Sequence, residues 1–224
     1  MTIDRKSFAR TIDHTYLKID GGYTEIKLRC LEAEKHGFAS VAVFPVAVPL
    51  VASCLKDSDV VVCAALAFHL GAYPPEIKAF EVRDTIAKGA AEVDMVMNVA
   101  AAKSGNWDLL KEEFDRFREA AGDKIAKIIL ETCLLTDEEK VKVCELAKEA
   151  ELDFVKTSTG YKEGATVPDV KLMHKTVSPQ LKVKASGGIR TLENALAMIK
   201  AGASRLGTSA GVTLMERYDK KFGC

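Results

Sequence analysis

Residues 182–211 read KVKASGGIRTLENALAMIKAGASRLGTSAG and contain one complete strand–helix–strand unit. Lys182–Ala185 and Arg205–Thr208 are short runs in which apolar residues are frequent, as in parallel strands that are covered on both faces. Between them, Thr191 is a helix-capping residue placed directly before the amphipathic stretch Leu192–Lys200. Glycines follow both runs. The unit therefore predicts two parallel strands joined by a helix, with glycine-rich loops at the carboxyl ends of the strands.

The same alternation of apolar runs and helical patterns continues along the rest of the chain. Six further runs predict strands: Thr11–Thr15 (the weakest), Ser40–Phe44, Val60–Leu66, Val93–Asn98, Lys127–Glu131 and Phe154–Lys156. Apolar residues at spacings of three and four predict a helix over Trp107–Ala121. Thr136 and Glu139 form a capping box that begins a helix ending near Ala150. The pattern is thus about eight strands, each followed by a helix.

A chain of this pattern is an α/β protein, and it either closes into a (β/α)8 TIM barrel or opens into a doubly wound sheet. The even strand count and the lack of an early GxGxxG after a strand favour the barrel. No Pro-, Ser- or Gly-rich tract divides residues 1–224, so a single barrel domain is expected. Because barrel enzymes place their sites at the carboxyl ends of the strands, polar residues there are the functional candidates.

Composition excludes several classes of protein. The 224 residues carry 32 Lys and Arg against 32 Asp and Glu, and this balance argues against nucleic acid as the main partner. The apolar runs are too short to span a membrane, and residues 1–10 lack the apolar core of a signal peptide. Six cysteines without a CxxC pair indicate reduced thiols, and four scattered histidines do not predict a metal site. We expect a soluble cytoplasmic protein without a cofactor or metal.

Two lysines lie inside predicted strands, where a charged amine is costly to bury. Lys156 ends one strand, and Lys184 occupies the matching place one repeat later, 28 residues along the chain. Each lysine alone could reach solvent or pair with a carboxylate, but in a closed barrel both point into one cavity. Burial and like charge then lower the pKa of an amine. A free lysine, with a pKa near 10.4, is neutral in about one molecule in 2,500 at pH 7. A pKa of about 7–8 would supply the neutral amine that attacks a carbonyl, so Schiff-base chemistry is the leading interpretation.

Acidic and hydroxyl side chains end other strands. Asp94 lies in an apolar strand, where it serves as an ion-pair partner for these lysines, as a proton carrier, or as both. Asp13 and Thr15 end the first strand, and Glu131 ends another. Hydrogen bonding to substrate hydroxyls and purely structural bonding are equally compatible with these three positions.

Glycine loops follow the seventh and eighth strands, where barrel enzymes commonly bind phosphate through backbone N–H groups. These loops place Gly187, Gly188, Gly207, Thr208 and Ser209 as candidate phosphate contacts, and Gly160 and Lys162 could extend the same rim. The alternative interpretation is that both loops are tight turns without a ligand.

The motifs that surround these residues resemble those of the deoxyribose-phosphate aldolase family. The resemblance rests on EVDMVMN at 92–98, FVKTSTG at 154–160 and VKASGGIRT at 183–191. It extends to DHT at 13–15, KAFE at 78–81, ILET at 129–132 and GTS at 207–209, so it covers nearly the whole chain in order.

The resemblance implies a metal-independent class I aldolase of (β/α)8 fold. Such enzymes reversibly cleave 2-deoxy-D-ribose 5-phosphate into D-glyceraldehyde 3-phosphate and acetaldehyde, in deoxyribonucleotide catabolism. Lys156 would form the imine, while Lys184 would lower its pKa and, with Asp94, move protons through a water. Pattern alone does not distinguish Lys156 from Lys184 as the nucleophile. The motif positions also imply substrate contacts, namely Asp13, Thr15, Thr157, Gly187, Gly188, Gly207, Thr208 and Ser209.

The sequence departs from this family at several positions. Ala67-Phe68-His69 stands where a Gly-Phe-Pro-like turn is expected, Pro74 and Pro75 replace threonines, and Ala100 replaces a glycine. These changes affect acceptor preference more than reaction type. Three alternatives stay open: a transaldolase-like Schiff-base aldolase, a zinc-dependent aldolase, and a non-catalytic phosphosugar-binding barrel. A homodimer is expected only from the habit of barrel enzymes to pair.

Overall fold

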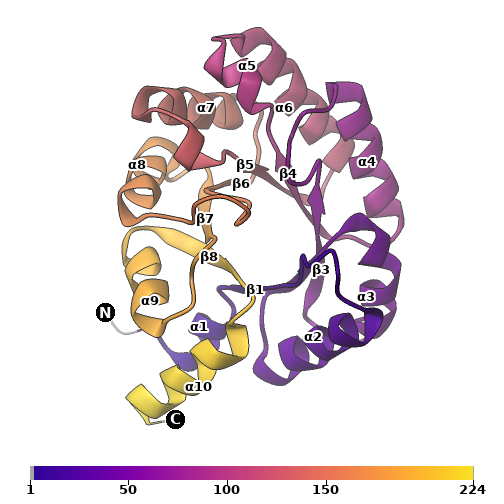
Figure 1. Ribbon diagram of the computed structural model, residues 1–224, viewed down its shortest axis with the longest axis vertical. Helices are drawn as coiled ribbons and strands as arrows, with labels where there is room; N and C mark the ends of the chain where they lie inside the picture. The colour runs from indigo at the N-terminus through magenta and orange to yellow at the C-terminus, as the bar shows by residue number, and fades with distance from the viewer. Residues whose placement is uncertain (1–2, 224) are drawn as a thin grey trace.

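The structure, a computed structural model, describes residues 3–223 and consists of one closed barrel of eight parallel strands inside a ring of helices (Figure 1). The strands are β1 (Ile12–Thr15), β2 (Ser40–Val43), β3 (Val61–Leu66), β4 (Glu92–Val96), β5 (Ile125–Ile129), β6 (Phe154–Lys156), β7 (Lys182–Ser186) and β8 (Ala203–Thr208). They pair in chain order, and β8 closes on β1 with Asp13 opposite Gly207. The (β/α)8 prediction is confirmed.

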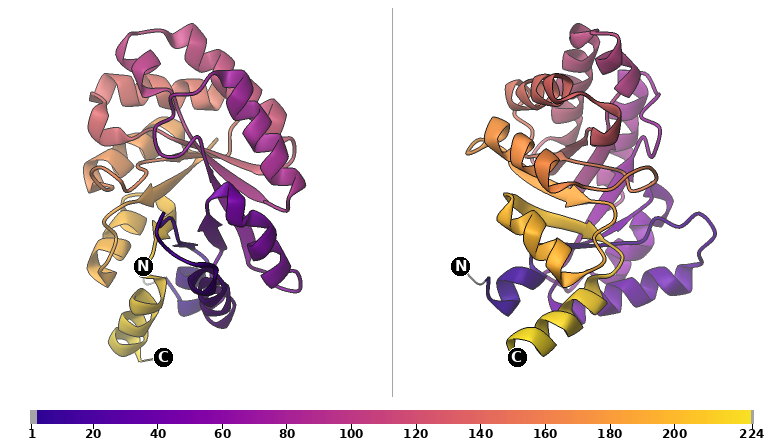
Figure 2. Two further views of the ribbon diagram at one scale, coloured as in Figure 1. Left: turned by 45° about the vertical axis from the view of Figure 1, so that its right-hand side comes forward. Right: turned by 60° about the vertical axis from the view of Figure 1, so that its left-hand side comes forward.

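The helices cover the outside of the barrel, as the side views in Figure 2 show. They are α1 (Arg5–Ala9), α2 (Tyr23–His36), α3 (Val48–Cys54), α4 (Pro75–Ala87), α5 (Val99–Lys103), α6 (Trp107–Ala121), α7 (Asp137–Glu149), α8 (Val167–Val177), α9 (Leu192–Lys200) and α10 (Gly211–Phe222). Two 3-10 turns, Pro45–Ala47 and Thr132–Leu134, follow β2 and β5. In the described part of the chain, no helix is long and apolar enough to cross a membrane.

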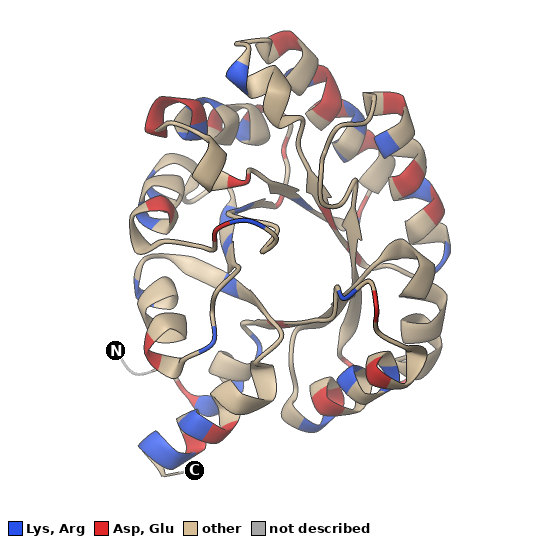
Figure 3. Ribbon diagram, in the orientation of Figure 1, with Lys and Arg blue, Asp and Glu red and all other residues tan. Residues whose placement is uncertain are grey.

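The predicted helix signals act as expected. The Thr136 hydroxyl accepts from the Glu139 N–H while the Glu139 carboxylate accepts from the Thr136 N–H, which closes the capping box of α7. Thr191 caps α9 by accepting from the Asn194 N–H. Pro75 is the first residue of α4, a position that needs no backbone N–H donor. Acidic and basic residues alternate over the outer helices (Figure 3), as expected for a solvent-facing ring.

The strands are apolar on the face that packs against the helices, and this packing forms the hydrophobic core. Val41, Val93, Ile128 and Val183 are fully buried in that layer. The other face of the same strands points into the barrel and carries charged residues. Because the apolar outer face of each strand is packed against helices, the charged side chains on the inner face are held at fixed positions below the carboxyl ends of the strands.

α1 was not predicted from the sequence. It comes before β1 and lies beside α10, where Arg5 forms an ion pair with Asp219 and Phe8 stacks on Tyr218 at 5.0 Å. A helix of five residues has almost no stability alone. Its contacts with a segment more than 200 residues away hold it in place, and a local sequence pattern does not reveal them.

Candidate active site

A cavity of about 330 Å³ lies at the carboxyl ends of β1, β6, β7 and β8. The loop after β6 curls toward the middle of the barrel opening, next to this cavity (Figure 1). The residues that line it are Thr15, Tyr16, Leu17, Lys18, Arg29, Lys156, Thr159, Gly160, Tyr161, Ser186, Gly187, Gly188, Ile189, Arg190, Gly207, Thr208 and Ser209. Its position agrees with the strand-end site expected for a barrel enzyme.

Lys156 lines the cavity and is the buried amine closest to the predicted chemistry. Its Nζ donates to Oδ2 of Asp94 at 2.8 Å, and Nζ of Lys184 donates to the same oxygen at 2.6 Å. β6 and β7 pair with Lys156 opposite Lys184, so the barrel presents the two amines side by side. Lys156 is 5% exposed and opens onto the cavity, whereas Lys184 is fully buried beneath it. The two amines therefore share one Asp94 oxygen, but of the two only Lys156 is among the residues that line the cavity.

The two amines have opposite electrostatic environments. Burial, and then the positive charge of Lys184, lower the pKa of Lys156 against the opposing effect of Asp94. The pKa of Lys184 is raised instead, because Asp13 and Asp94 both contact it and outweigh its burial. The sequence argument attributed the lowered pKa to mutual repulsion together with burial. In the structure, burial is the main cause of the lowered pKa of Lys156, and Lys184 has acidic partners of its own in Asp13 and Asp94.

Further charged side chains lie below these amines, inside the barrel. Lys127 on β5 donates to Glu92 at 2.5 Å and to Asp94 at 2.9 Å. Arg205 on β8 contacts Asp13 and donates to Glu92 at 2.8 Å. We call the connected set the strand network; its members are Asp13, Glu92, Asp94, Lys127, Lys156, Lys184 and Arg205.

The strand network contains four cations and three acids, so with every group ionised it has a surplus of one positive charge. An uncompensated buried charge is costly, so one cation is favoured to lose its proton. Arg205 does not deprotonate in proteins, and the pKa values of Lys127 and Lys184 are raised because the neighbouring carboxylates outweigh the effect of burial. Lys156 pairs with a single acid among the described residues, Asp94, and it is the cation of this set whose pKa is lowered.

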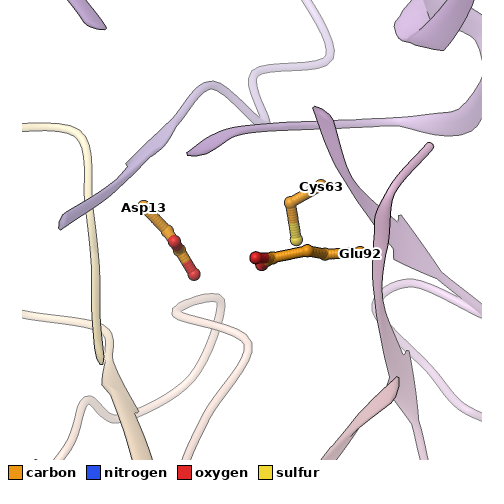
Figure 4. Close-up of side chains that lie close together, drawn as sticks. All are labelled: Asp13, Cys63 and Glu92. Atoms are coloured by element: carbon orange, nitrogen blue, oxygen red, sulfur yellow. The ribbon is translucent and has the colours of Figure 1, made fainter. Parts of the chain in front are cut away.

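Asp13, Cys63 and Glu92 bring possible metal ligands within 4.8 Å of one another, and Figure 4 shows the side chains converging from β1, β3 and β4. The carboxylates are already paired with Arg205, Lys184 and Lys127. Burial and the neighbouring Asp94 raise the pKa of the Cys63 thiol to about 12, and this thiol donates to Asp94 at 3.2 Å. Two carboxylates that already pair with cations of the strand network and a protonated thiol do not fit a divalent cation.

The structure brings most of the predicted substrate contacts to the cavity, but not all of them. Thr15, Gly187, Gly188, Gly207, Thr208 and Ser209 line it, and Gly160 joins them. Asp13 is fully buried between Ser40, Lys184 and Arg205. Thr157 is also fully buried, and its hydroxyl accepts from the Ser186 N–H at 3.1 Å. Both residues lie beneath the cavity, where they hold its floor and the start of the β7 loop.

The two glycine loops pack closely at one side of the cavity. Gly187 and Gly188 have φ angles of +84° and +73°, which a residue with a Cβ rarely adopts. A Cβ on Gly207 would lie 2.8 Å from the Ser186 Cβ, so the β8 loop also requires glycine. The Thr208 hydroxyl donates to the Ile189 carbonyl at 2.7 Å and ties the two loops together. α10 begins directly after them without a side-chain cap, which leaves backbone N–H groups for an anion.

The β6 loop crosses toward β1 on the other side. The Tyr161 hydroxyl donates to the Leu17 carbonyl at 2.8 Å, and its ring stacks on His69 at 4.2 Å. Glu131 anchors the start of the loop by accepting from the Thr159 hydroxyl at 2.5 Å. The first part of the loop is thus fixed at two points, Thr159 and Tyr161. Glu131, a candidate substrate contact from the sequence, instead supports this wall of the cavity.

Comparison with known proteins identifies the family. Residues 3–215 match the model of the DeoC/LacD family aldolase. The chain is a DeoC/LacD family aldolase.

Relatives and solved structures agree with this placement. Proteins named deoxyribose-phosphate aldolase from Streptococcus sanguinis (strain SK36) and Thermoanaerobacter pseudethanolicus (strain ATCC 33223 / 39E) are 55% and 53% identical to the aldolase. The matches cover 92% and 96% of this chain and 94% and 98% of theirs. The structure described as the unique tetrameric structure of deoxyribose phosphate aldolase from Aeropyrum pernix superimposes with a TM-score of 0.91 at 28% identity. That match covers 97% of this chain and 93% of the other.

The third-strand loop of the aldolase shows how its unusual residues are accommodated. Ala67 has a φ of +49°, in the left-handed region that favours glycine. Its N–H donates to the Glu81 carboxylate of α4 at 2.7 Å, which holds the turn. His69, which replaces the expected proline, supplies the ring on which Tyr161 stacks. His69 thus supports the cavity wall through Tyr161, and neither Ala67 nor His69 belongs to the strand network.

Sequence reasoning missed Lys127, Glu92 and Arg205. Each is a charged residue inside or beside an apolar strand run, which is the signal that singled out Lys156 and Lys184. The same criterion applied to every predicted strand would have found all three.

Proposed function

We propose that this aldolase is a class I deoxyribose-phosphate aldolase, which reversibly cleaves 2-deoxy-D-ribose 5-phosphate to D-glyceraldehyde 3-phosphate and acetaldehyde through an imine on Lys156. The observation that carries the proposal is the lowered pKa of an amine that opens onto the cavity and shares one Asp94 oxygen with Lys184. The relatives' names support the substrate assignment.

In the cleavage direction, the neutral Lys156 amine attacks the C1 aldehyde, and loss of water gives the imine. A proton then leaves the C3 hydroxyl, the C2–C3 bond breaks, and its electron pair moves into the iminium to give an enamine. Release of D-glyceraldehyde 3-phosphate is followed by protonation of the enamine at C2 and hydrolysis to acetaldehyde. Lys184 and Asp94 are placed to move these protons through a water, and Asp13 keeps Lys184 charged.

The phosphate of the sugar is assigned to the glycine loops after β7 and β8. Gly187, Gly188, Gly207, Thr208 and Ser209 line the cavity there, and the uncapped start of α10 favours negative charge. Thr15 lies at the end of β1 within reach of the sugar chain.

Reductive trapping tests this function directly. Incubation with acetaldehyde and borohydride is expected to add one ethyl group to the protein, and peptide mass spectrometry is expected to map it to Lys156. Full cleavage activity after treatment with a chelator is the control against a zinc-dependent aldolase. An adduct with dihydroxyacetone phosphate or fructose 6-phosphate but not acetaldehyde would instead indicate a transaldolase-like enzyme. No adduct with any carbonyl would indicate a non-catalytic binding barrel.

The charge surplus of the strand network predicts opposite pH shifts for two nearly isosteric variants. Lys127→Met balances the network at three cations and three acids, so the pKa of Lys156 rises and the acidic limb of kcat/KM moves to higher pH by about one unit. Glu92→Gln increases the surplus, so the same limb moves to lower pH. The measurement is a pH–rate profile of cleavage for both variants, with the double variant expected near the parent profile. Shifts in one direction for both variants would contradict the charge balance.

The setting proposed for the enzyme follows from the same assignment. Its partners are the small phosphosugar and its aldehyde products, in the cytoplasmic breakdown of deoxyribonucleotides. Cys30, Cys54, Cys63, Cys133 and Cys144 are free thiols, in keeping with a reducing compartment, and Cys224 lies outside the described residues. A homodimer stays a prediction, for which the exposed Leu31 of α2 and Phe80 of α4 offer apolar contacts.

A further inference from the structure

The cavity concentrates positive charge in a chain of zero net charge. Lys18, Arg29, Arg190 and Lys156 line it, and none of the described residues in its lining is acidic. Such a wall favours the binding of an anionic substrate over that of a neutral one.

Arg29 differs from the other rim cations because it is anchored. Lys18 and Arg190 are exposed, whereas the Arg29 side chain is 25% exposed and its Nη1 donates to Glu32 at 2.5 Å, one turn along α2. Glu32 also contacts Nε2 of the buried His14 on β1 at 2.7 Å. The guanidinium is therefore fixed to the barrel, and binding a ligand costs it little side-chain entropy.

The closure of the barrel places this guanidinium near the β8 loop. His14 pairs with Thr208 across the β1–β8 junction, and Arg29 Nη1 lies 3.5 Å from the His14 Nε2. A Cβ on Gly211, the first residue of α10, would lie 2.8 Å from the other ring nitrogen of His14. One imidazole thus separates Arg29 from the start of α10, where the glycine loop leaves backbone N–H groups available.

The guanidinium also has an uncommitted donor group. Its Nη2 makes no hydrogen bond within residues 3–223, and the side chain lines the cavity. The Nε also lacks a hydrogen-bond partner, but it is buried. An N–H group of arginine donates a charge-assisted hydrogen bond to a phosphate oxygen.

We propose that Arg29 is a specificity-determining residue of this enzyme, which binds the phosphate of the substrate together with the β8 loop and so selects phosphorylated over unphosphorylated sugars. The proposal rests on the proposed function for the identity of the substrate. It adds a side chain from α2 to a subsite otherwise built from backbone groups.

The test compares Arg29→Leu and Arg29→Lys with Lys27→Leu, a matched control that removes an exposed cation two residues earlier on α2. KM and kcat are measured for 2-deoxyribose 5-phosphate and for unphosphorylated 2-deoxyribose. Arg29→Leu is expected to raise KM for the phosphorylated sugar about 10- to 100-fold, the loss of one charge-assisted contact. Its kcat, and its kcat/KM for 2-deoxyribose, stay within about twofold. Arg29→Lys is expected to be intermediate, and Lys27→Leu to match the parent.

An equal loss on both sugars would show that Arg29 only supports His14 and Glu32, and an unchanged KM for the phosphorylated sugar would show that it does not contact phosphate. Either result overturns the proposal. Calorimetry of inorganic phosphate binding to the parent and to Arg29→Leu tests whether Arg29 contacts phosphate independently of turnover. A parent that does not cleave 2-deoxyribose 5-phosphate but binds phosphate more tightly than Arg29→Leu would reject the proposed function and keep the Arg29 site.

Discussion

Replacing Lys156 with alanine is expected to lower aldol cleavage by about 10⁴-fold or more, because Lys156 is the buried amine of the cavity lining and burial lowers its pKa. The iminium formed on Lys156 accepts the electron pair of the breaking C2–C3 bond and becomes a stabilised enamine. Without Lys156 no imine forms, so the whole pathway is lost. The measurement is the steady-state rate of acetaldehyde release, together with reductive trapping, which should give no ethyl adduct in this variant.

The same variant is expected to keep its fold. Removing Lys156 leaves three cations and three acids in the strand network, the same balance that a neutral Lys156 gives, and Asp94 keeps Lys127 and Lys184 as partners. The melting temperature is therefore expected to equal or exceed that of the parent. Lys175→Ala, which removes an exposed lysine on the outer helix α8, is the control and should retain activity. Cleavage within tenfold of the parent, or an ethyl adduct on another lysine, would contradict the assignment of Lys156.

The fold was predictable because its strands are short apolar runs at regular spacing. β6 begins and ends as predicted, and the other strands differ by one or two residues at one or both ends. One of these differences has a clear physical cause. β4 includes Glu92, which the sequence run excluded, because Lys127 and Arg205 neutralise it inside the barrel. In the sequence, a charged residue beside an apolar run looks like the end of the strand, because its ion-pair partner lies on another strand and cannot be identified.

The site was predictable where one strand alone carries the signal. Lys156, Lys184 and Asp94 stand out locally because a charge interrupts an apolar run. Arg29 carries no such signal, since it lies on the outer helix α2 among other charged residues. It reaches the cavity only because β1 and β8 meet when the barrel closes. Contacts formed where the barrel closes join residues near the two ends of the chain, and the spacing of residues in the sequence does not predict them.

Replacing Lys184 with leucine is expected to lower kcat at pH 7 by about 10⁴-fold, through two separable effects. The variant leaves three cations and three acids, so the pKa of Lys156 rises; a rise of about two units reduces its neutral fraction about 100-fold at pH 7. The proton carrier beside Asp94 is also lost, which costs about another 100-fold. The two contributions respond differently to pH.

Raising the pH restores the neutral Lys156 amine but cannot restore the missing proton carrier. At pH 9.5 the deficit of Lys184→Leu relative to the parent is therefore expected to shrink to about 100-fold. Lys182→Leu, which removes an exposed lysine two residues earlier on β7, is the matched control and should follow the parent profile. A deficit that is the same at both pH values would mean that Lys184 acts on protons without setting the charge of Lys156. Turnover near that of the parent at pH 7 would contradict both roles, because neither the charge surplus nor the shared Asp94 oxygen would then matter to the reaction.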